Sequence, residues 1–271
     1  MPEKEPYRTK IATFNIGDFS GRGFEKGSEE AKAAHTATMG KADAELWALQ
    51  EDVYWFGGVQ GLSPYDAIYS AYPHYYREYT GEYNGKAFLS KYALEDVAPV
   101  AYPTVATSYA PEGTTAYGHP WFLTGSITLG DKKIAIVTLH FDWSCKERRA
   151  AQIDAVIKYA QAQEYCIITG DFNPENLINN QLQQDGDSIA PDSKNMYHLD
   201  WKKFSDAGFR HANGGEHGVL GTIMKNGEPA SPYPWDNIVV TPNISILHAQ
   251  AIYKPWMNDH AILVADLEID E

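Results

Sequence analysis

The sequence predicts an α/β fold in which β-sheets pack against one another and helices cover their outer faces. Two observations support this prediction: short apolar segments typical of strands recur along the chain, and helical segments are interleaved with them. A third observation concerns domains. No repeat, linker or shift in composition divides the 271 residues, so we expect a single domain over residues 1–271.

The expected strands are short runs rich in apolar and β-branched residues. In chain order they cover residues 10–16, 46–50, 87–90, 121–129, 133–139, 165–169, 234–241 and 260–269. The fourth and fifth of these flank the pair Gly130-Asp131, which is typical of a hairpin turn.

Two helices are expected between the strands. Ser28 can cap the first, which carries glutamates in its first turn and runs to about residue 42. Residues 146–163 form the second, because apolar residues recur there at helical spacing. Pro174 fits the first turn of a further helix.

The charge balance bears on possible partners. Lys and Arg number 22 and Asp and Glu 36, which gives a net charge of 22 − 36 = −14. Such a chain does not hold polyanions by its overall field, because phosphate binding normally rests on Lys and Arg. Any phosphate chemistry is therefore expected to be local and assisted by a cation. The sequence indicates no protein partner.

The chain carries no obvious targeting or disulfide signal. No apolar stretch is long enough to cross a bilayer. The N-terminal residues MPEKEPYRTK lack the pattern of a signal peptide, which favours the cytosol, although a secreted chain whose leader had been removed would look the same. Cys145 and Cys166 could pair or stay free, and Cys166 stands in an apolar run, as a small core residue would.

Six of the strand ends carry polar residues suited to metal or phosphate chemistry. These residues are Asn15, Glu51, His140, Asp171 with Asn173, Asp236, and Asp259 with His260. Because an unpaired buried charge is costly, this recurrence predicts that the side chains meet in space. Carboxylates could then hold a hard cation such as Mg²⁺, while amides and imidazoles bind a phosphoryl group or act as acid or base.

The segment GDFN places two of these residues close together in the sequence. Side chains alternate along a strand, so Asp171 and Asn173 are expected on the same face. The carboxylate could orient a water molecule while the amide supports the neighbouring oxyanion. A plainer interpretation exists for each residue taken alone: His140 as a satisfied core histidine, and Asp171 with Asn173 as the start of a turn.

The polar ends belong to short motifs that occur in a definite order. The motifs are ATFNI, ALQE, GKAFLSK, TLH, GDFN, WDNIVV and NDH. In this order they resemble the endonuclease/exonuclease/phosphatase superfamily, whose fold is that of deoxyribonuclease I. The resemblance runs from about residue 10 to residue 269.

The resemblance implies a four-layer α/β/β/α sandwich with the site at one edge, and a metal-dependent phosphodiester hydrolase, with nucleases among its members. It implies that Glu51, helped by Asn15 and Asp259, holds Mg²⁺ or Mn²⁺. In this sequence Asn258 stands in NDH where the family usually has a serine.

The resemblance also implies catalytic roles. Asp171 would orient or deprotonate the attacking water, and Asn173 and His140 would bind the non-bridging phosphate oxygens. His260, held by Asp236, would transfer a proton or donate to the phosphate. No covalent enzyme intermediate is expected.

Three further residues are candidates for binding the substrate or its phosphate. Lys86 occupies a slot of GKAF that relatives often fill with Asn or a small residue, and it could equally lie at the rim. His119 stands where relatives often have an arginine, and it could equally be a loop histidine before Pro120. Arg149 belongs to the Arg-x-x-Gln of the second helix.

The motifs do not choose the phosphoester. The leading expectation is a phosphodiester substrate, with nucleic acid one possibility. The alternative is a monoesterase or diesterase acting on a small phosphorylated lipid or sugar, and an inactive binding homologue is disfavoured because all expected catalytic residue types are present. Residues 65–83 and 101–121, rich in Tyr, His and Pro, are expected loops whose tyrosines could stack on bases or sugars or pack on the surface.

Overall fold

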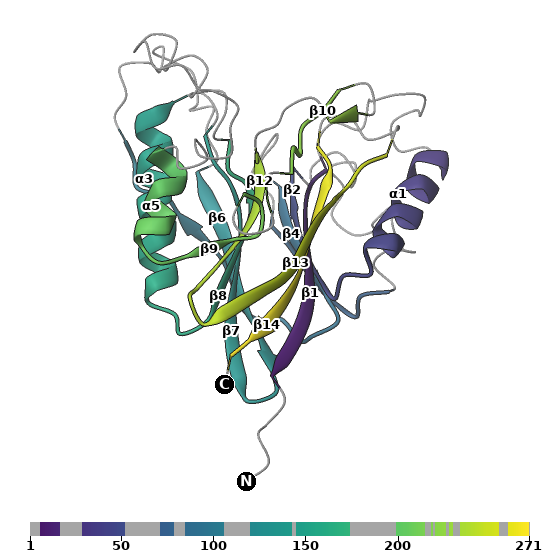
Figure 1. The fold of residues 1–271 in the computed structure, drawn as a ribbon, viewed down its shortest axis with the longest axis horizontal. Helices are drawn as coiled ribbons and strands as arrows, with labels where there is room; N and C mark the ends of the chain where they lie inside the picture. Colours follow the sequence, from purple (N-terminus) through teal and green to yellow (C-terminus); the bar gives the residue numbers. More distant parts are fainter. Residues whose placement is uncertain are drawn as a thin grey trace.

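Two mixed β-sheets lie face to face in this computed structural model, and helices cover both outer faces (Figure 1). The structure describes residues 6–16, 29–51, 71–78, 85–105, 120–142, 145–173, 199–214, 218, 220–225, 228–229, 234–254 and 260–270. Helix α1 (Glu29–Ala42) lies outside the first sheet, and α3 (Lys146–Gln161) and α5 (Leu199–Asp206) lie outside the second. The predicted four-layer sandwich is therefore confirmed.

The first sheet has the strand order β13-β14-β1-β2-β4-β3. These strands are β1 (Tyr7–Asn15), β2 (Leu46–Gln50), β3 (His74–Glu78), β4 (Lys86–Ser90), β13 (Ile244–Ile252) and β14 (Ile262–Ile269). Only β1 and β2 are parallel among these pairs, and α1 stands between them in the chain.

The second sheet has the order β5-β6-β7-β8-β12-β9. Its strands are β5 (Glu95–Ala101), β6 (Trp121–Leu129), β7 (Lys132–His140), β8 (Cys166–Asp171), β9 (Arg210–His211) and β12 (Asp236–Val240). Here β7 and β8 are the parallel pair, with α3 between them. A separate two-stranded ribbon pairs β10 (Met224–Lys225) with β11 (Glu228–Pro229).

The two parallel pairs explain why the polar strand ends come together. Parallel strands joined by a helix bring both of their carboxyl ends to the same edge of a sheet. Asn15 and Gln50 therefore end β1 and β2 side by side, and His140 and Asp171 end β7 and β8 side by side. The sheets are stacked so that β1 faces β8 and β2 faces β7, which sets these two edges against each other.

Apolar side chains fill the three interfaces between the four layers. The cluster between the sheets includes Ile11, Leu46, Leu123, Ile136 and Ile167. A second cluster lies between the first sheet and α1, and a third lies between the second sheet and the pair α3 and α5. Burial of this kind contributes roughly 25 cal/mol per Å² of apolar surface and is the main force that holds the layers together.

The expected strands and both expected helices are present, with ends that shift by a few residues. The hairpin across Gly130 is confirmed as the antiparallel pair β6 and β7. The interpretation of residues 65–83 as loop is wrong for residues 74–78, which form β3. This strand lies at the edge of its sheet with most of its side chains partly exposed, so it lacks a clear apolar pattern.

Six other elements were not expected from the sequence: β5, β9, β10, β11, β13 and α5. Ser28, Pro174 and most of residues 101–121 lie outside the described part of the chain. Cys145 and Cys166 are both free and buried, and Cys166 is the core residue that its apolar surroundings indicate. Among the described residues, no helix combines the length and apolar character needed to cross a membrane.

Candidate active site

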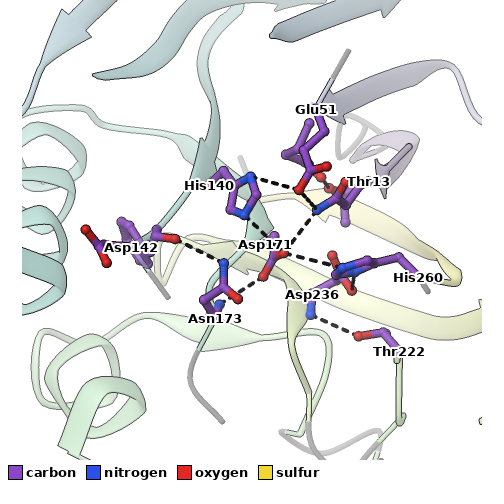
Figure 2. A network of polar contacts seen from close by, with 12 residues as sticks. Thr13, Glu51, His140, Asp142, Asp171, Asn173, Thr222, Asp236 and His260 are labelled. Atoms are coloured by element: carbon purple, nitrogen blue, oxygen red, sulfur yellow. Dashed lines mark hydrogen bonds and ion pairs between the residues drawn. The ribbon is translucent and has the colours of Figure 1, made fainter. Parts of the chain in front are cut away.

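The side chains that end the central strands of both sheets meet at one edge of the sandwich (Figure 2). Asn15 of the first sheet joins the two sheets directly. Its Nδ2 donates to Asp171 Oδ2 and to Glu51 Oε1, each at 3.1 Å. The structure thus brings an amide and two carboxylates into contact, although 156 residues separate Asn15 from Asp171.

Three adjacent strands of the second sheet supply a row of ionisable groups. His140 stands beside Asp171 in the β7–β8 register, and Asp236 stands opposite Asp171 in the β8–β12 register. His140 Nε2 lies 3.4 Å from Asp171 Oδ2, and its Nδ1 lies 3.7 Å from Glu51 Oε1. His140 therefore spans the two carboxylates that Asn15 also joins.

His260 completes the group from the side of the first sheet. Its Nδ1 lies 2.8 Å from Asp236 Oδ2, and its Nε2 lies 3.6 Å from Asp171 Oδ2. The Asp236 carboxylate fixes the imidazole and favours a proton on Nδ1. The backbone N–H of Asp236 in turn donates to Thr222 Oγ1 at 3.0 Å, which anchors the start of β12.

Burial dominates the electrostatics of this group. The Asp171 side chain is only 2% exposed, and burial raises its pKa above the usual carboxyl range. His260 opposes this rise, the Asp236 carboxylate adds to it, and the hydrogen bonds from Asn15 and the Asn173 backbone oppose it. Two carboxylates directly opposite each other on neighbouring strands repel, so a bound cation would relieve the arrangement.

The turn after β8 is shaped by the residues of GDFN. A side chain at Gly170 would place its Cβ 2.1 Å from the Leu139 carbonyl oxygen, so only glycine allows β7 and β8 to approach this closely. Asn173 has a φ of 47°, a left-handed conformation that asparagine tolerates. Its backbone N–H donates to Asp171 Oδ1 at 2.9 Å, and its Nδ2 donates to the Phe141 carbonyl at 3.0 Å.

The expected reason for the nearness of Asp171 and Asn173 is therefore wrong. Strand β8 ends at Asp171, so the alternation of side chains along a strand does not apply to Asn173. The turn hydrogen bond from Asn173 to the Asp171 carboxylate holds the two residues together instead.

Glu51 also has a left-handed backbone, with a φ of 54°. This conformation costs about 1–2 kcal/mol for a residue other than glycine. The Glu51 side chain is 18% exposed, more than that of Asp171, His140 or His260. It is thus the carboxylate of the group that solvent reaches best.

The sequence reasoning missed a polar layer directly beneath these groups. Gln50 Nε2 donates to Thr13 Oγ1 at 3.0 Å in its own sheet and to Thr138 Oγ1 at 2.8 Å in the other sheet. Thr169 Oγ1 donates to the Val137 carbonyl at 2.7 Å. A signal was present: threonine precedes Asn15, His140 and Asp171 by two residues in each case.

Four predicted residues lie outside this group or outside the described chain. His119 and Asp259 belong to segments that the structure does not describe. Arg149 is buried in α3, and its Nη1 donates to the Asp142 carbonyl at 3.3 Å. Lys86 is fully buried at the start of β4, and its ammonium lies 4.1 Å from the centroid of the Trp121 ring.

Arg149 supports the segment that follows β7. Gln152 Oε1 accepts a hydrogen bond from the Asp142 backbone N–H at 2.8 Å, and Arg149 contacts the carbonyl of the same residue. The preceding carbonyl, that of Phe141, is the acceptor for Asn173. Arg149 and Gln152 thus hold the backbone to which Asn173 is bonded.

The donor set suits a divalent cation. Oxygen-rich clusters with few protein ligands are what Mg²⁺ and Mn²⁺ prefer. Among the described residues, Asp171, Asp236 and His260 form a group that could hold a metal ion, because their ligand atoms all lie within 4.8 Å of one another.

Solved structures with the same architecture include three informative cases. An endonuclease/exonuclease/phosphatase family protein from Bacteroides thetaiotaomicron has 16% sequence identity and a TM-score of 0.65, and the match covers 99% of this chain and 100% of that one. TDP2 from D. rerio has 14% identity and a TM-score of 0.59, with 96% and 98% covered. The human Nocturnin catalytic domain has 14% identity and a TM-score of 0.65, with 97% and 94% covered.

At these identities the solved structures establish the likeness of fold alone. No curated protein sequence matches the chain. The sequence profile of the Endonuclease/Exonuclease/phosphatase family, in contrast, matches residues 12–173, which include Asn15, Glu51, His140, Asp171 and Asn173. The match covers more than half of the chain and contains the end of β1 together with β2, β7 and β8. The chain therefore belongs to the endonuclease/exonuclease/phosphatase family.

Proposed function

We propose that the protein is a Mg²⁺- or Mn²⁺-dependent phosphodiester hydrolase that cleaves its substrate by in-line attack of a water molecule. The observation that carries the proposal is the meeting of Asn15, Glu51, His140 and Asp171 at a single point between the sheets. Membership of a phosphoesterase family supports the same chemistry.

Glu51 is the residue best suited to hold the metal. Its carboxylate is the most exposed of the group, so a cation bound there can keep the water ligands that Mg²⁺ retains. Asn15 and Asp259 are the proposed partners. Asp171, Asp236 and His260 are a second possible metal site. There, Nδ1 of His260 is bonded to Asp236, so a metal ion would have to bind His260 through Nε2. A bound divalent ion would neutralise charge on the phosphate and support the leaving oxygen.

Asp171 is proposed as the group that orients or deprotonates the attacking water. A general base works best when its pKa lies near the operating pH, and burial raises the pKa of Asp171 in that direction. The two imidazoles flank this carboxylate, His140 at 3.4 Å and His260 at 3.6 Å. A phosphate held beside Asp171 is therefore within reach of donors on two sides.

His260 is proposed to donate to the phosphate or to transfer a proton, with Asp236 holding its ring. Asn173 is proposed to bind a non-bridging oxygen through its side-chain amide. One N–H of this amide is used by the Phe141 carbonyl, and an NH₂ group has a second to offer.

Two of the similar structures bear on the ligand. The TDP2 structure is described as a complex with a single-strand DNA product, and the Nocturnin domain as binding a sulfate anion. Both ligands carry tetrahedral oxyanions. They support a phosphoester as the substrate of this chain, and the DNA complex keeps nuclease activity as the first class to test.

A panel of substrates tests the proposal. The purified protein would be incubated with Mg²⁺ or Mn²⁺ and with plasmid DNA, RNA, bis-p-nitrophenyl phosphate, p-nitrophenyl phosphate, inositol phosphates and sphingomyelin. We expect turnover of at least one diester, loss of turnover on chelation, and loss in Asp171→Asn. Turnover of monoesters alone would support the alternative, a monoesterase for small phosphorylated molecules, and would overturn the diesterase proposal.

A further inference from the structure

Lys86 begins β4, the strand next to β2 in the first sheet, and β4 also faces the second sheet near the site. Across the sheets, β1 lies against β8, β2 against β7, and β4 against both β6 and β7. Lys86 stands opposite Gln50 in the β2–β4 register, and Gln50 is the residue that precedes Glu51. Neighbouring strands are about 4.8 Å apart, so Lys86 is one strand away from the segment that ends in Glu51.

Trp121 faces Lys86 from the second sheet. Leu123 pairs with Thr138 in the β6–β7 register, so Trp121 and His140 lie two residues further toward the edge that carries the site. The Lys86 ammonium lies 4.1 Å from the centroid of the Trp121 ring. The pair Lys86–Trp121 thus continues the line of facing residues beyond Glu51 and His140.

Lys86 is an unusual residue for this position. Its side chain is fully buried, and among the described residues its ammonium has no hydrogen-bond partner. Burial lowers the pKa of Lys86 to about 7, and the Glu51 carboxylate opposes that fall. An unpaired buried ammonium reduces stability, so an apolar side chain here would make the fold more stable.

We propose that Lys86 offsets the negative charge around Glu51 from its buried position between the sheets, so that a divalent cation binds less tightly and an anionic phosphate binds more tightly. This inference rests on the proposed function and deepens it. Because its side chain is fully buried, Lys86 acts by charge and does not touch the substrate.

The physical reason is the low dielectric between the sheets. A positive charge there is poorly screened, and it acts on neighbouring charges over several ångströms. The ammonium repels a cation bound at Glu51 and attracts the phosphate oxygens that approach the same point. The two ligands therefore respond to Lys86 with opposite signs, and a purely structural residue would not produce this pattern.

The test compares Lys86→Met with wild type in two binding measurements. Mn²⁺ binding to the metal-free protein is measured by isothermal titration calorimetry below the Lys86 pKa, and orthovanadate binding is then measured at saturating Mn²⁺. We expect Lys86→Met to bind Mn²⁺ about tenfold more tightly and vanadate about tenfold more weakly, each the effect of ~1.4 kcal/mol. Its melting temperature should be equal to or above that of wild type.

Lys91→Met is the matched control. Lys91 follows the other end of β4 and lies 3.9 Å from Asp43, so its substitution removes the same charge far from the site. Both affinities should stay at wild-type values in this variant. If Lys86→Met does not fold, Lys86→Gln is measured in its place, and failure of both to fold would show a structural role and overturn the proposal.

Unchanged affinities in Lys86→Met, or a fall in both, would also overturn it. These readouts do not depend on turnover. If the wild-type protein hydrolyses no phosphoester, the proposed function is refuted. The Mn²⁺ and vanadate affinities of Lys86→Met would then still decide the role of Lys86.

Discussion

The two ends of the layer between the sheets both contain buried side chains but are chemically opposite. At one end the strands carry apolar residues such as Ile134, Leu267 and Ile269, each fully buried. At the other end the same strands or their neighbours carry His140 and Asp171, which are 4% and 1% exposed. Burial alone therefore does not decide residue type here. The polar end gives up hydrophobic stabilisation, which indicates that another requirement fixes its residues.

A polar layer separates these two ends. Gln50 reaches across the sheets to Thr138 and also holds Thr13. These groups satisfy one another, so they tolerate burial without a ligand. Beyond them, the charged groups are placed closer together than their mutual repulsion favours. The difference indicates that Gln50 and its partners have a structural role and that the charged residues have a chemical one.

The largest effect is expected at the charged end. Asp171→Asn keeps the size of the side chain and removes its ability to accept a proton, so the turnover number should fall by about 10³-fold. Metal-dependent hydrolysis of the best diester measures the effect. At a pH above the raised pKa of Asp171, the melting temperature of the metal-free variant should not fall, because a charge repulsion has been removed. Turnover near wild type would remove Asp171 from the mechanism.

A substitution at the apolar end should lower stability and leave turnover unchanged. Leu267→Ala leaves a cavity between the sheets and should lower the free energy of unfolding by about 3 kcal/mol. Urea denaturation measures this loss. At a temperature where the variant is still folded, its turnover number should equal that of wild type. A large loss of turnover there would show that the two ends are not independent.

Changes in pH should sharpen the comparison. The raised pKa of Asp171 means that the native, metal-free protein binds a proton that the unfolded chain releases near pH 3.9. Its stabilising contribution is complete below that pH and is lost as the pH rises through the folded pKa. The free energy of unfolding of wild type relative to Asp171→Asn should therefore fall with rising pH. A relative stability that is constant or rises with pH would contradict the raised pKa.

The smallest effect is expected in the polar layer. Gln50→Leu and Thr138→Val should each lower the free energy of unfolding by about 1–2 kcal/mol, because each leaves a buried partner unsatisfied. The double variant should cost less than the sum of the two, by about 1 kcal/mol. Additive costs in this double-mutant cycle would mean that the hydrogen bond across the sheets contributes little.

The central strands of the fold could be predicted from the sequence because they are buried and consist of nearly uninterrupted apolar residues. Asn15, His140 and Asp171 could be expected together because each is a polar residue at the end of a buried strand, where an unpaired charge is costly. The structure brings these strand ends together through two strand–helix–strand units. The edge strands β3 and β13 could not be predicted, because their exposed and buried positions do not follow a clear alternation. Helix α5 has only eight residues, too few for a periodic pattern.

The identity of the site residues could be predicted more easily than the positions of their side chains in space. The turn that bonds Asn173 to Asp171 depends on backbone dihedrals that a motif does not state. The burial of Lys86 and Arg149 follows from long-range packing, so neither could be placed from the local sequence. From the sequence alone, both look like surface cations.

A crystal soaked in Mn²⁺ and phosphate tests the central claim most directly, because anomalous scattering locates the ion without reference to activity. The account predicts an anomalous peak about 2.0–2.2 Å from a Glu51 carboxylate oxygen, with phosphate between the ion and Asp171. A peak enclosed by Asp171, Asp236 and His260 alone would contradict the assignment of Glu51. No peak at this edge of the sandwich would contradict the proposal of a metal-dependent hydrolase.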